Sequence, residues 1–592
     1  MIGLEPSVGT GPVPSQFSTD SIASVARTSL RESIISTPSG AAPAKEGRFI
    51  SFVRGWRPLS GMWNDIRSRA LFYVSDWTDA WNYRVVPATT VIFFANILPG
   101  IAFSLDLIET TAQYGVTEVL LSTFMAAFVF SMLGGQPLCI AGVTGPITVF
   151  NRTIYIILEG RPDSPNYLFF IGWVYLWSAI MHWVLAVFNG KHSTCNFLQY
   201  VTLFSCDTFG FYVSWVYLQY GVQVITRQFG GLSSTSTPEG PYVSIILALL
   251  VLVTAHLFIA LSKTTLFHRL VRRFLSDYGM PITVVAGTAA AHWGRFNTSH
   301  PTTLPIAGAF EPANGRAWLV EFWQLEGKWV GVAFPFGIIL TILFLFDHNV
   351  SSLIAQGSQF PLRKPPGFHW DLFLLGVTTF IAGLLGIPAP NGLIPQAPIH
   401  TQSLVVLGHR KGEDEEHGSE AEKPHHSTLD GQPIAVIEQR VSNLIQGSLC
   451  LVLMTGPFLH VLHLVPRGVL AGLFWYMGSA ALQTSGITAK MLFLLRDPTL
   501  ADTNDPLHKV RKSRIALFVI IQLLGFGATM AITQTIAAVG FPVIIILLIP
   551  LRMFVIPRLP FTHDELAILD GPTASAFTMA SVGGSASFSR RK

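Results

Sequence analysis

The sequence predicts an all-α, polytopic membrane protein with fourteen transmembrane segments. Of its 592 residues, 50% are hydrophobic and only 12% are charged, and the mean hydropathy is +0.48. A soluble domain of this size does not normally have such a composition. Apolar runs long enough to cross a hydrocarbon layer of about 30 Å recur along the chain, and charged residues gather between them.

Eight apolar runs are long and continuous enough to be predicted as complete transmembrane helices. They cover residues 86–108, 117–135, 166–188, 240–262, 329–354, 370–388, 441–465 and 514–536. Six further runs are shorter, or are interrupted by glycine, proline or polar residues. They cover residues 137–158, 198–225, 279–293, 391–408, 466–494 and 538–558. Together the two groups give the fourteen spans.

The positions of the basic residues predict that both termini lie in the cytosol. With the N-terminus inside, the loops after even-numbered spans are cytosolic, and three of these loops are rich in lysine and arginine. Their basic residues are Lys263, Arg269, Arg272 and Arg273, then Arg363 and Lys364, and then Arg496, Lys509, Arg511, Lys512 and Arg514. The first outer loop, residues 105–115, has acidic residues but no basic one.

Four stretches are predicted to lie outside the membrane. They are a disordered N-terminal tail, an extracellular loop, a cytosolic loop of mixed charge and a cytosolic C-terminal tail, at residues 1–75, 294–328, 409–435 and 559–592. The extracellular loop contains the sequon Asn297-Thr298-Ser299, so Asn297 is a candidate glycosylation site. The cytosolic loop contains His417, His425 and His426, which lack metal-ligand spacing, and no metal site is predicted.

The motifs that the sequence lacks exclude several classes of function. It has no phosphate-binding loop, no zincin motif and no nucleophile elbow, so neither ATP-driven transport nor an enzyme is predicted, and no cofactor is expected. Basic residues are not interleaved with aromatic ones, which argues against nucleic acid as a partner. The cysteines lie in or beside apolar segments and are expected to be buried thiols; they are Cys139, Cys195, Cys206 and Cys450.

Two interrupted spans occupy corresponding positions in the two halves of the chain. In the third span an extended apolar run precedes Gly145-Pro146, and residues 147–158 are predicted to be helical. In the tenth span, residues 386–398 contain four prolines and two glycines, and residues 399–407 are predicted to be helical. Two seven-span repeats would place one break in the third span of each. If the repeats are inverted, two helix N-termini face each other and offer N–H donors to an oxyanion.

A third polar feature is Asp347, which lies in the apolar run at residues 332–352. A carboxylate at membrane depth is costly unless it faces a cavity or takes up a proton, so Asp347 is the candidate for coupling or protonation. The alternative is that the span ends near Phe346 and that Asp347 lies at the membrane interface. Three other polar residues in apolar surroundings are expected to make structural hydrogen bonds: Asn96, Glu118 and Asp207.

Six motifs resemble those of the boron-transporter branch of the anion-exchanger and bicarbonate-transporter family. They are Asp76–Arg84 (DWTDAWNYR), Gly142–Phe150 (GVTGPITVF), Phe346–Ser352 (FDHNVSS), Asn391–Leu404 (NGLIPQAPIHTQSL), Glu438–Asn443 (EQRVSN) and Val465–Phe474 (VPRGVLAGLF). The resemblance runs from about Trp77 to Leu569. It implies two inverted seven-span repeats, in which a core domain moves against a gate domain.

The implied core domain consists of spans 1–4 and 8–11, at residues 76–190 and 329–465. The gate domain consists of spans 5–7 and 12–14, at residues 198–293 and 466–558, and it forms a homodimer. The resemblance also implies a substrate site between the half-helices of spans 3 and 10, beside span 8. The matching residues are Val143, Thr144, Gly145, Ile147, Asp347, Pro395 and Gln396.

One of these residues bears on the substrate. The chloride/bicarbonate exchangers of the family have an arginine where this chain has Gln396, and the boron branch has the glutamine. Without that fixed positive charge, the site suits a neutral or weakly acidic solute with hydroxyl groups. Boric acid and borate have three or four hydroxyls that both donate and accept hydrogen bonds.

We therefore predict a secondary transporter that exports boric acid or borate across the plasma membrane by an elevator-like mechanism. A bicarbonate or inorganic anion exchanger is one alternative, and a membrane sensor or scaffold that moves nothing is another. A scaffold would not need to retain both interrupted spans and Asp347, so transport is favoured.

Overall fold

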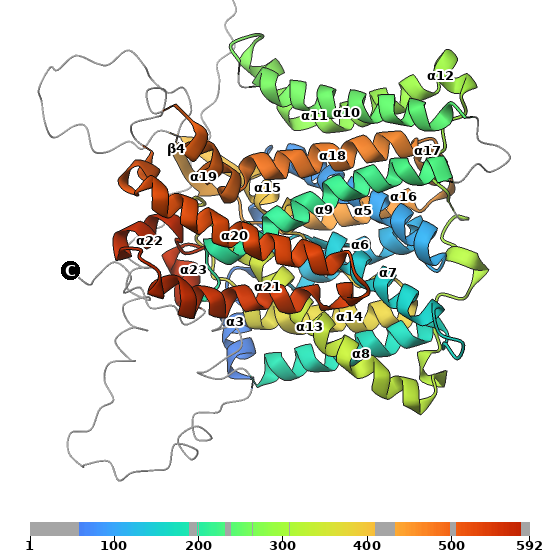
Figure 1. Ribbon diagram of the computed structural model, residues 1–592, viewed down its shortest axis with the longest axis horizontal. Helices are drawn as coiled ribbons and strands as arrows, with labels where there is room; N and C mark the ends of the chain where they lie inside the picture. Colours follow the sequence, from blue (N-terminus) through green and yellow to red (C-terminus); the bar gives the residue numbers. More distant parts are fainter. Residues whose placement is uncertain are drawn as a thin grey trace, which may run out of the picture. The chain divides into compact units, whose positions relative to one another are not determined.

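The computed structural model describes residues 59–188, 198, 200–230, 238–262, 264–306, 308–408, 432–497 and 505–581. In this part of the chain, long helices lie side by side (Figure 1), and two pairs of short strands accompany them. Some predictions concern residues outside the described ranges: most of the tail at 1–75, most of the loop at 409–435 with its three histidines, Cys195, and residues 582–592.

The helices follow the predicted spans closely. They are α5 (Val85–Thr111), α6 (Val116–Leu133), α7 (Gly145–Glu159), α8 (Tyr167–Val187), α9 (Leu203–Gly230), α10 (Gly240–Ser262), α11 (Arg269–Ala291), α13 (Gly327–Ala355), α14 (Phe368–Leu385), α15 (Gln396–Ser403), α16 (Val441–Leu453), α17 (Gly456–His463), α18 (Arg467–Thr484), α19 (Gly486–Leu495), α20 (Lys512–Thr533) and α21 (Phe541–Pro550).

Shorter elements lie before, between and after these helices. They are the α-helices α3 (Ser60–Ala70), α4 (Tyr73–Thr78), α12 (Arg295–Thr298), α22 (His563–Leu569) and α23 (Ala576–Ser581). Short 3-10 helices are η2 (Ala313–Gly315), η3 (Phe322–Gln324), η5 (Pro506–Lys509), η6 (Ile536–Gly540) and η8 (Ile556–Arg558), and η7 (Leu551–Val555) is a π-helix. The strands are β1 (Ala141–Gly142), β2 (Asn391–Gly392), β3 (Val405–Gly408) and β4 (Gln432–Val436).

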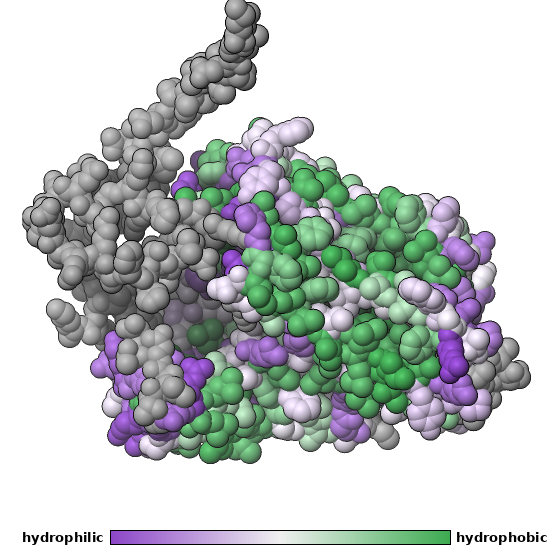
Figure 2. All heavy atoms as spheres, turned by 90° about the horizontal axis from the view of Figure 1, so that it is seen from above, coloured by the Kyte–Doolittle hydropathy of each residue, from purple (hydrophilic) through white to green (hydrophobic). Residues whose placement is uncertain are grey.

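Among the described residues, eight helices are long and apolar enough to cross a membrane, or nine if the bent pair α16–α17 is counted as one span. Figure 2 shows hydrophobic residues over the middle of one face and hydrophilic residues toward both ends. A bilayer requires this distribution from a spanning protein. The prediction of a mostly helical, multi-pass membrane protein is therefore confirmed. The number fourteen and the inverted repeats stay predictions, since the other predicted spans are shorter or less apolar.

Two predicted spans are not straight helices. Helices α16 and α17 meet at an angle of 85°, and α17 begins at Gly456-Pro457. Proline has no backbone N–H and fits the first turn of a helix, which explains why a new helix starts there. Helices α18 and α19 are separated at Ser485, whose side chain accepts a hydrogen bond from the N–H of Ile487 at 3.3 Å and so caps α19.

Near the end of the tenth span the structure corrects the sequence prediction. The helix in this region, α15, begins three residues earlier than predicted and ends at Ser403. Residues 405–407, predicted as its last turn, belong to β3, which pairs antiparallel with β4. The β-branched residues Val405 and Val406 favour a strand. Strand β4 begins at Gln432, so the predicted loop at 409–435 ends earlier than expected.

The closest helix pairs join the two halves of the chain. Helix α8 packs against α13 and α14, α6 packs against α16, and α9 and α10 pack against α18. In Figure 1 the last group forms adjacent layers, with α10 and α11 beside α18 and α18 beside α9. Small residues permit the close approach: a Cβ atom added at Gly478 of α18 would lie 2.7 Å from the carbonyl oxygen of Ser214 in α9.

The three polar residues singled out in apolar surroundings all have partners. Asn96 donates to the side-chain oxygen of Gln446 at 3.1 Å, and Lys490 pairs with Asp207 at 3.1 Å. Glu118 accepts a hydrogen bond from the N–H of Ala313 at 2.6 Å. The last contact fixes part of the predicted extracellular loop against α6. The prediction of structural hydrogen bonds is confirmed for all three residues.

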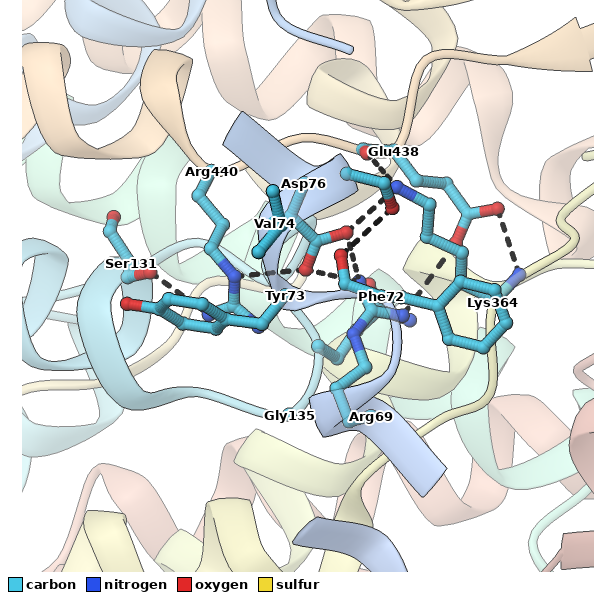
Figure 3. A network of polar contacts seen from close by, with 12 residues as sticks. Arg69, Phe72, Tyr73, Val74, Asp76, Ser131, Gly135, Lys364, Glu438 and Arg440 are labelled. Atoms are coloured by element: carbon cyan, nitrogen blue, oxygen red, sulfur yellow. Dashed lines mark hydrogen bonds and ion pairs between the residues drawn. The ribbon is translucent and has the colours of Figure 1, made fainter. Parts of the chain in front are cut away.

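A buried network of charged side chains links the segment before α5 to the segment before α16 (Figure 3). Asp76 is fully buried, and its carboxylate accepts hydrogen bonds from Arg69 at 3.1 Å, Arg440 at 2.9 Å and Lys364 at 2.8 Å. Glu438 accepts a hydrogen bond from the N–H of Lys364 at 3.1 Å and lies 3.9 Å from Arg69. Since these residues come from distant parts of the chain, the network fixes the two halves to each other.

Helix α3 corrects the prediction of a disordered tail at residues 1–75, because residues 60–70 are helical and pack against α8 and α14. Asp65 anchors this helix: its carboxylate accepts hydrogen bonds from the N–H groups of His369 at 2.8 Å and Trp370 at 3.3 Å. Burial outweighs these contacts and raises the pKa of Asp65 to about 7, and Asp371 adds a smaller effect in the same direction.

We expect the packing of α3 to weaken as the pH rises through about 7. The pKa of Asp65 in the folded state lies above its unfolded value of about 3.9, so the folded state binds the proton more tightly. The resulting stabilisation is fully present below about pH 4 and is lost as the pH passes the folded value. Hydrogen exchange of the α3 amides, corrected for intrinsic rates, measures this effect. Asp65→Asn should remove the pH dependence; an unchanged dependence would assign it to another group.

Candidate functional site

Two extended segments, one from each half of the chain, pair directly before the two short helices. Strands β1 and β2 are antiparallel, with Ala141 opposite Gly392 and Gly142 opposite Asn391, and all four residues are buried. Helix α5 packs closely on β1, since a Cβ atom on Gly142 would lie 2.8 Å from the side-chain oxygen of Asn96. The pairing satisfies backbone groups that a membrane interior would otherwise leave without partners.

Helix α7 starts immediately after β1, as the sequence predicted for the third span. Val143, Thr144, Gly145 and Ile147 are all buried at this start. The Ile147 N–H donates to the Thr144 hydroxyl at 3.4 Å, and Pro146 has no N–H to donate. Within the described chain, the backbone N–H of Gly145 is therefore the donor of the first turn that is left for a ligand, at the positive end of the helix dipole.

Helix α15 repeats this arrangement in the second half. It starts at Gln396, directly after Pro395. The Ala397 N–H donates to the carbonyl oxygen of Leu393 at 3.0 Å, and Pro398, the third residue of the helix, has no N–H. Within the described chain, the backbone N–H of Gln396 is thus left for a ligand in the same way. Each half contributes one first-turn amide, and the predicted convergence of the two helix starts around a substrate stays a prediction.

Asp347 lies within α13 and is 2% exposed. Its carboxylate accepts a hydrogen bond from the side-chain amide of Asn391 at 3.4 Å, and Asn391 belongs to β2. Asp347 therefore faces the crossing of the two extended segments. Helix α13 continues past Phe346 as far as Ala355, so the helix does not end before this carboxylate.

Gln396 is fully buried and only half of its side chain has a partner. Its amide nitrogen donates to the carbonyl oxygen of Ala95 at 3.2 Å. The hydroxyl of Tyr217 lies near the Gln396 side chain, but the Gln396 carbonyl oxygen makes no hydrogen bond of normal geometry within the described chain. A buried acceptor without a partner costs about 1–3 kcal/mol, which a hydroxylated ligand would recover.

Three neighbours of these residues had no role in the sequence prediction. Asn391 donates to Asp347, and Tyr217 lies beside Gln396. His348 is buried against Phe130, with 5.1 Å between ring centroids, and neither ring nitrogen has a partner among the described residues. Asn391 and His348 belong to motifs that carry the family resemblance, so their signal was present. Tyr217 is on α9, which only the folded chain brings here.

The arrangement offers two backbone donors, a buried carboxylate and an unpaired amide carbonyl from α7, α15 and α13. These groups suit a small solute with several hydroxyls. None of the seven predicted residues lines the pocket found beside α7, so a polar cavity between the two helix ends stays a prediction. In the described part of the chain, no group of three or more histidine, cysteine or acidic residues is placed to hold a metal ion.

Comparison with known protein families shows which family the chain belongs to. The model of the HCO3- transporter integral membrane domain matches residues 57–231 and 222–574. The chain belongs to this bicarbonate-transporter family. The predicted resemblance is thereby confirmed. The integral membrane domain of this family covers nearly all described elements, from α3 to α22 and the start of the segment after it.

The relatives of this protein include proteins named boron transporters. It is 43% identical to Boron transporter 1 of Saccharomyces cerevisiae over 88% of this chain and 86% of the relative. It is 29% identical to Boron transporter 4 of Arabidopsis thaliana, over 87% of each. Identity with the Band 3 anion transport protein of Mus musculus is 26%, over 88% of this chain and 56% of the relative.

One solved structure has a similar fold. The murine anion transporter Solute Carrier 26 family member A9, in its inward-facing state, gives a TM-score of 0.50. The match covers 94% of this chain and 77% of that structure at 13% sequence identity, so it shows a similarity of fold and nothing about function. The proteins that these comparisons name are transporters, not enzymes.

Proposed function

We propose that this protein is a secondary transporter that moves boric acid or borate outward across the plasma membrane. The observation that supports it most is Gln396, whose buried carbonyl oxygen lacks a partner in the described chain. A glutamine at this position matches the boron branch of the family, and an arginine matches the chloride/bicarbonate exchangers. The boron transporters among the relatives support the same substrate.

The bound species is neutral boric acid. The only side-chain partner of Asp347 among the described residues is the amide of Asn391, and a neutral solute places no second negative charge beside this buried carboxylate. The hydroxyls of boric acid donate to the Asp347 carboxylate and to the side-chain carbonyl of Gln396. Its oxygens accept hydrogen bonds from the backbone N–H groups of Gly145 and Gln396. Asp347 is the coupling group, because its protonation changes the number of acceptors that the solute meets.

Replacement of Gln396 should weaken substrate binding moderately. In Gln396→Ala the ligand loses one neutral hydrogen bond, worth about 1 kcal/mol net, so the half-saturating concentration of boric acid should rise about fivefold. Initial boron efflux as a function of internal concentration measures it. Gln402→Ala, on the exposed side of the same helix, is the matched control. Equal values for Gln396→Ala and the control would show that this side chain does not touch the substrate.

Alternating access is proposed to follow the family's division into a moving core and a static gate, with a homodimer formed by the gate. Both termini are placed in the cytosol, and Asn297 stays a candidate glycosylation site. Asn297 is exposed, at the short helix α12. Helices assigned to the core meet gate helices along a boundary that includes the pairs α5–α18, α7–α9 and α13–α21. An elevator movement would slide these pairs past each other.

Charged pairs cross this boundary at the proposed outer end. Arg227 of α9 lies 2.7 Å from Asp106 and 3.0 Å from Glu109, both on α5, and Arg467 at the start of α18 also pairs with Glu109. Asp106 is 1% exposed but Arg227 is 28% exposed, so water reaches one partner of the first pair. Opening the outer side requires these pairs to separate.

Arg227→Gln should therefore favour the outward-open state. The lost pairs are worth about 1 kcal/mol, so a cysteine placed at Gln219 should be labelled about fivefold faster by a membrane-impermeant thiol reagent from outside. Lys328→Gln is the control, because Lys328, in the predicted extracellular loop, pairs with Asp163 of the proposed core at the same end of the protein, so this pair involves no gate helix. Labelling that is unchanged or slower in Arg227→Gln would argue against this boundary as the moving one.

Purified protein in liposomes tests the substrate. Vesicles are loaded with boric acid, and efflux is followed across pH gradients with and without chloride or bicarbonate outside. Efflux of boron that needs neither anion supports the proposal. Bicarbonate or chloride exchange without boron movement would support the anion exchanger, and no flux of any solute would support the sensor or scaffold.

A further inference from the structure

A pocket lies between α7, α9 and the end of α20, at the proposed outer end, and none of the seven predicted residues lines it. The space not filled by protein atoms at this place is about 290 Å³, a volume that includes open solvent at the pocket mouth. Its lining combines apolar surface, from Val149, Val216 and the tyrosine rings, with polar groups that include those of Arg152, Tyr212, Gln219 and Tyr220. Because α7 belongs to the proposed core and α9 to the gate, the pocket lies on the moving boundary.

Two buried hydroxyls in this pocket have no partner. Tyr212 is 1% exposed and Tyr220 is 3% exposed, and neither hydroxyl makes a hydrogen bond of normal geometry to a described residue, although Tyr212 lies near Thr533. Ring packing holds both side chains in place: Tyr212 lies 5.7 Å from Phe541, and Tyr220 is stacked on Phe474 at 5.8 Å. Two fixed, unsatisfied hydroxyls in one small pocket indicate a site that a polar ligand completes.

The pocket also has a positive charge that is only weakly paired. Arg152 lies 3.7 Å from Asp106, and its Nε atom has no partner among the described residues. Asp106 is held more closely by Arg227, at 2.7 Å. The local cluster has three arginines, including Arg467, and two carboxylates, including Glu109, which leaves one excess positive charge. The cation with the longest ion pair is the one that lines the pocket.

We propose that this pocket binds a small oxyanion, with the Arg152 guanidinium as its charge partner and the hydroxyls of Tyr212 and Tyr220 as its hydrogen-bond partners. A guanidinium matches the geometry of an oxyanion and keeps its charge at any physiological pH. The pocket takes borate, and only this choice of ion rests on the proposed function. The pocket is close to the candidate site, since a Cβ atom on Gly145 would lie 3.8 Å from Val216, which lines the pocket.

Protection of a reporter cysteine tests the site without requiring transport. Gln219→Cys is introduced with Cys195→Ser, because the other three cysteines are buried. The full-length protein is labelled from the outer side with an impermeant methanethiosulfonate in alkaline borate, where the anion is present. We expect borate to slow labelling, and an equal ionic strength of chloride to have no such effect. Protection that is equal in chloride would overturn the proposal, because it would reflect screening alone.

Variants then assign the contacts. Arg152→Gln should raise the half-protecting borate concentration tenfold or more, Arg152→Lys less, and Tyr212→Phe about fivefold. Lys328→Gln removes the same charge from the same end outside the pocket and should change it less than twofold. Full borate protection in a folded Arg152→Gln protein would overturn the proposal. Protection by sulfate or phosphate but not by borate would support an oxyanion site and contradict borate as its ligand. Intact borate protection without boron flux would contradict the proposed transport function and leave the site standing.

Discussion

Asp347→Asn should nearly abolish boron transport and leave the protein folded. The Asp347 carboxylate is buried, faces Asn391 of β2 and has no ion-pair partner in the described chain. Asparagine has the same shape but can neither carry the charge nor release a proton. Hydrogen bonds to a charged group are worth about 1.5–3 kcal/mol, so the loss should be about tenfold to 100-fold. Removal of a costly buried charge is often neutral or stabilising, so folding should survive.

The measurement is initial boron efflux against pH at matched surface expression. Asp163→Asn is the control, because it makes the same change at an exposed carboxylate that pairs with Lys328. The control should keep the wild-type rate and pH profile, and Asp347→Asn should lose both the rate and any pH dependence that the carboxylate provides. A wild-type rate and pH profile in Asp347→Asn would show that Asp347 is not part of the site, and the proposed site would then consist of the two half-helices alone.

Asp76→Ala should have the largest effect on stability. This carboxylate is the common acceptor of Arg69, Arg440 and Lys364, whose side chains are also largely buried (Figure 3). Its removal leaves buried cations without their partner, and breaking a buried ion pair costs about 3–5 kcal/mol. The free energy of unfolding in detergent, from denaturant titration followed by tryptophan fluorescence, should fall by this amount.

Asp79→Ala provides a matched comparison. Asp79 binds the same lysine, Lys364, at 2.8 Å, but its side chain is 48% exposed. An exposed ion pair contributes about 0–1 kcal/mol, so Asp79→Ala should change stability little. Similar losses for Asp76→Ala and Asp79→Ala would mean that burial of the network does not determine its contribution. The contrast also tests whether the segment before α5 is held to the segment before α16 through Asp76.

Local sequence patterns were sufficient for much of the fold. Long apolar runs placed α5, α6, α8, α10, α13, α14 and α20 within a few residues, because length and hydropathy alone decide whether a helix can span a bilayer. The starts of the two half-helices were also accessible. Gly145-Pro146 and the prolines around Gln396 restrict the backbone locally, so the breaks at these positions follow from the residues themselves.

Other features depend on contacts between distant residues and were not accessible. The register of β1 with β2 joins Gly142 to Asn391, and no local pattern specifies that pairing. Helix α3 was assigned to a disordered tail because its composition is polar, yet Asp65 docks it on α14. In the sequence, Tyr212 and Tyr217 look like ordinary residues of an apolar span. Only the folded chain brings Tyr212 near Asp347 and Tyr217 near Gln396. Partners of this kind need a three-dimensional structure.

Boron flux through the purified protein is the most direct test of the central claim, that the two helix ends and Asp347 form a boric acid pathway. Proteoliposomes loaded with boric acid are compared with protein-free vesicles and with vesicles that contain Asp347→Asn. The account predicts efflux well above that of both controls, dependent on pH and independent of external chloride. Efflux equal to that of protein-free vesicles at every pH, with correctly folded protein, would contradict it.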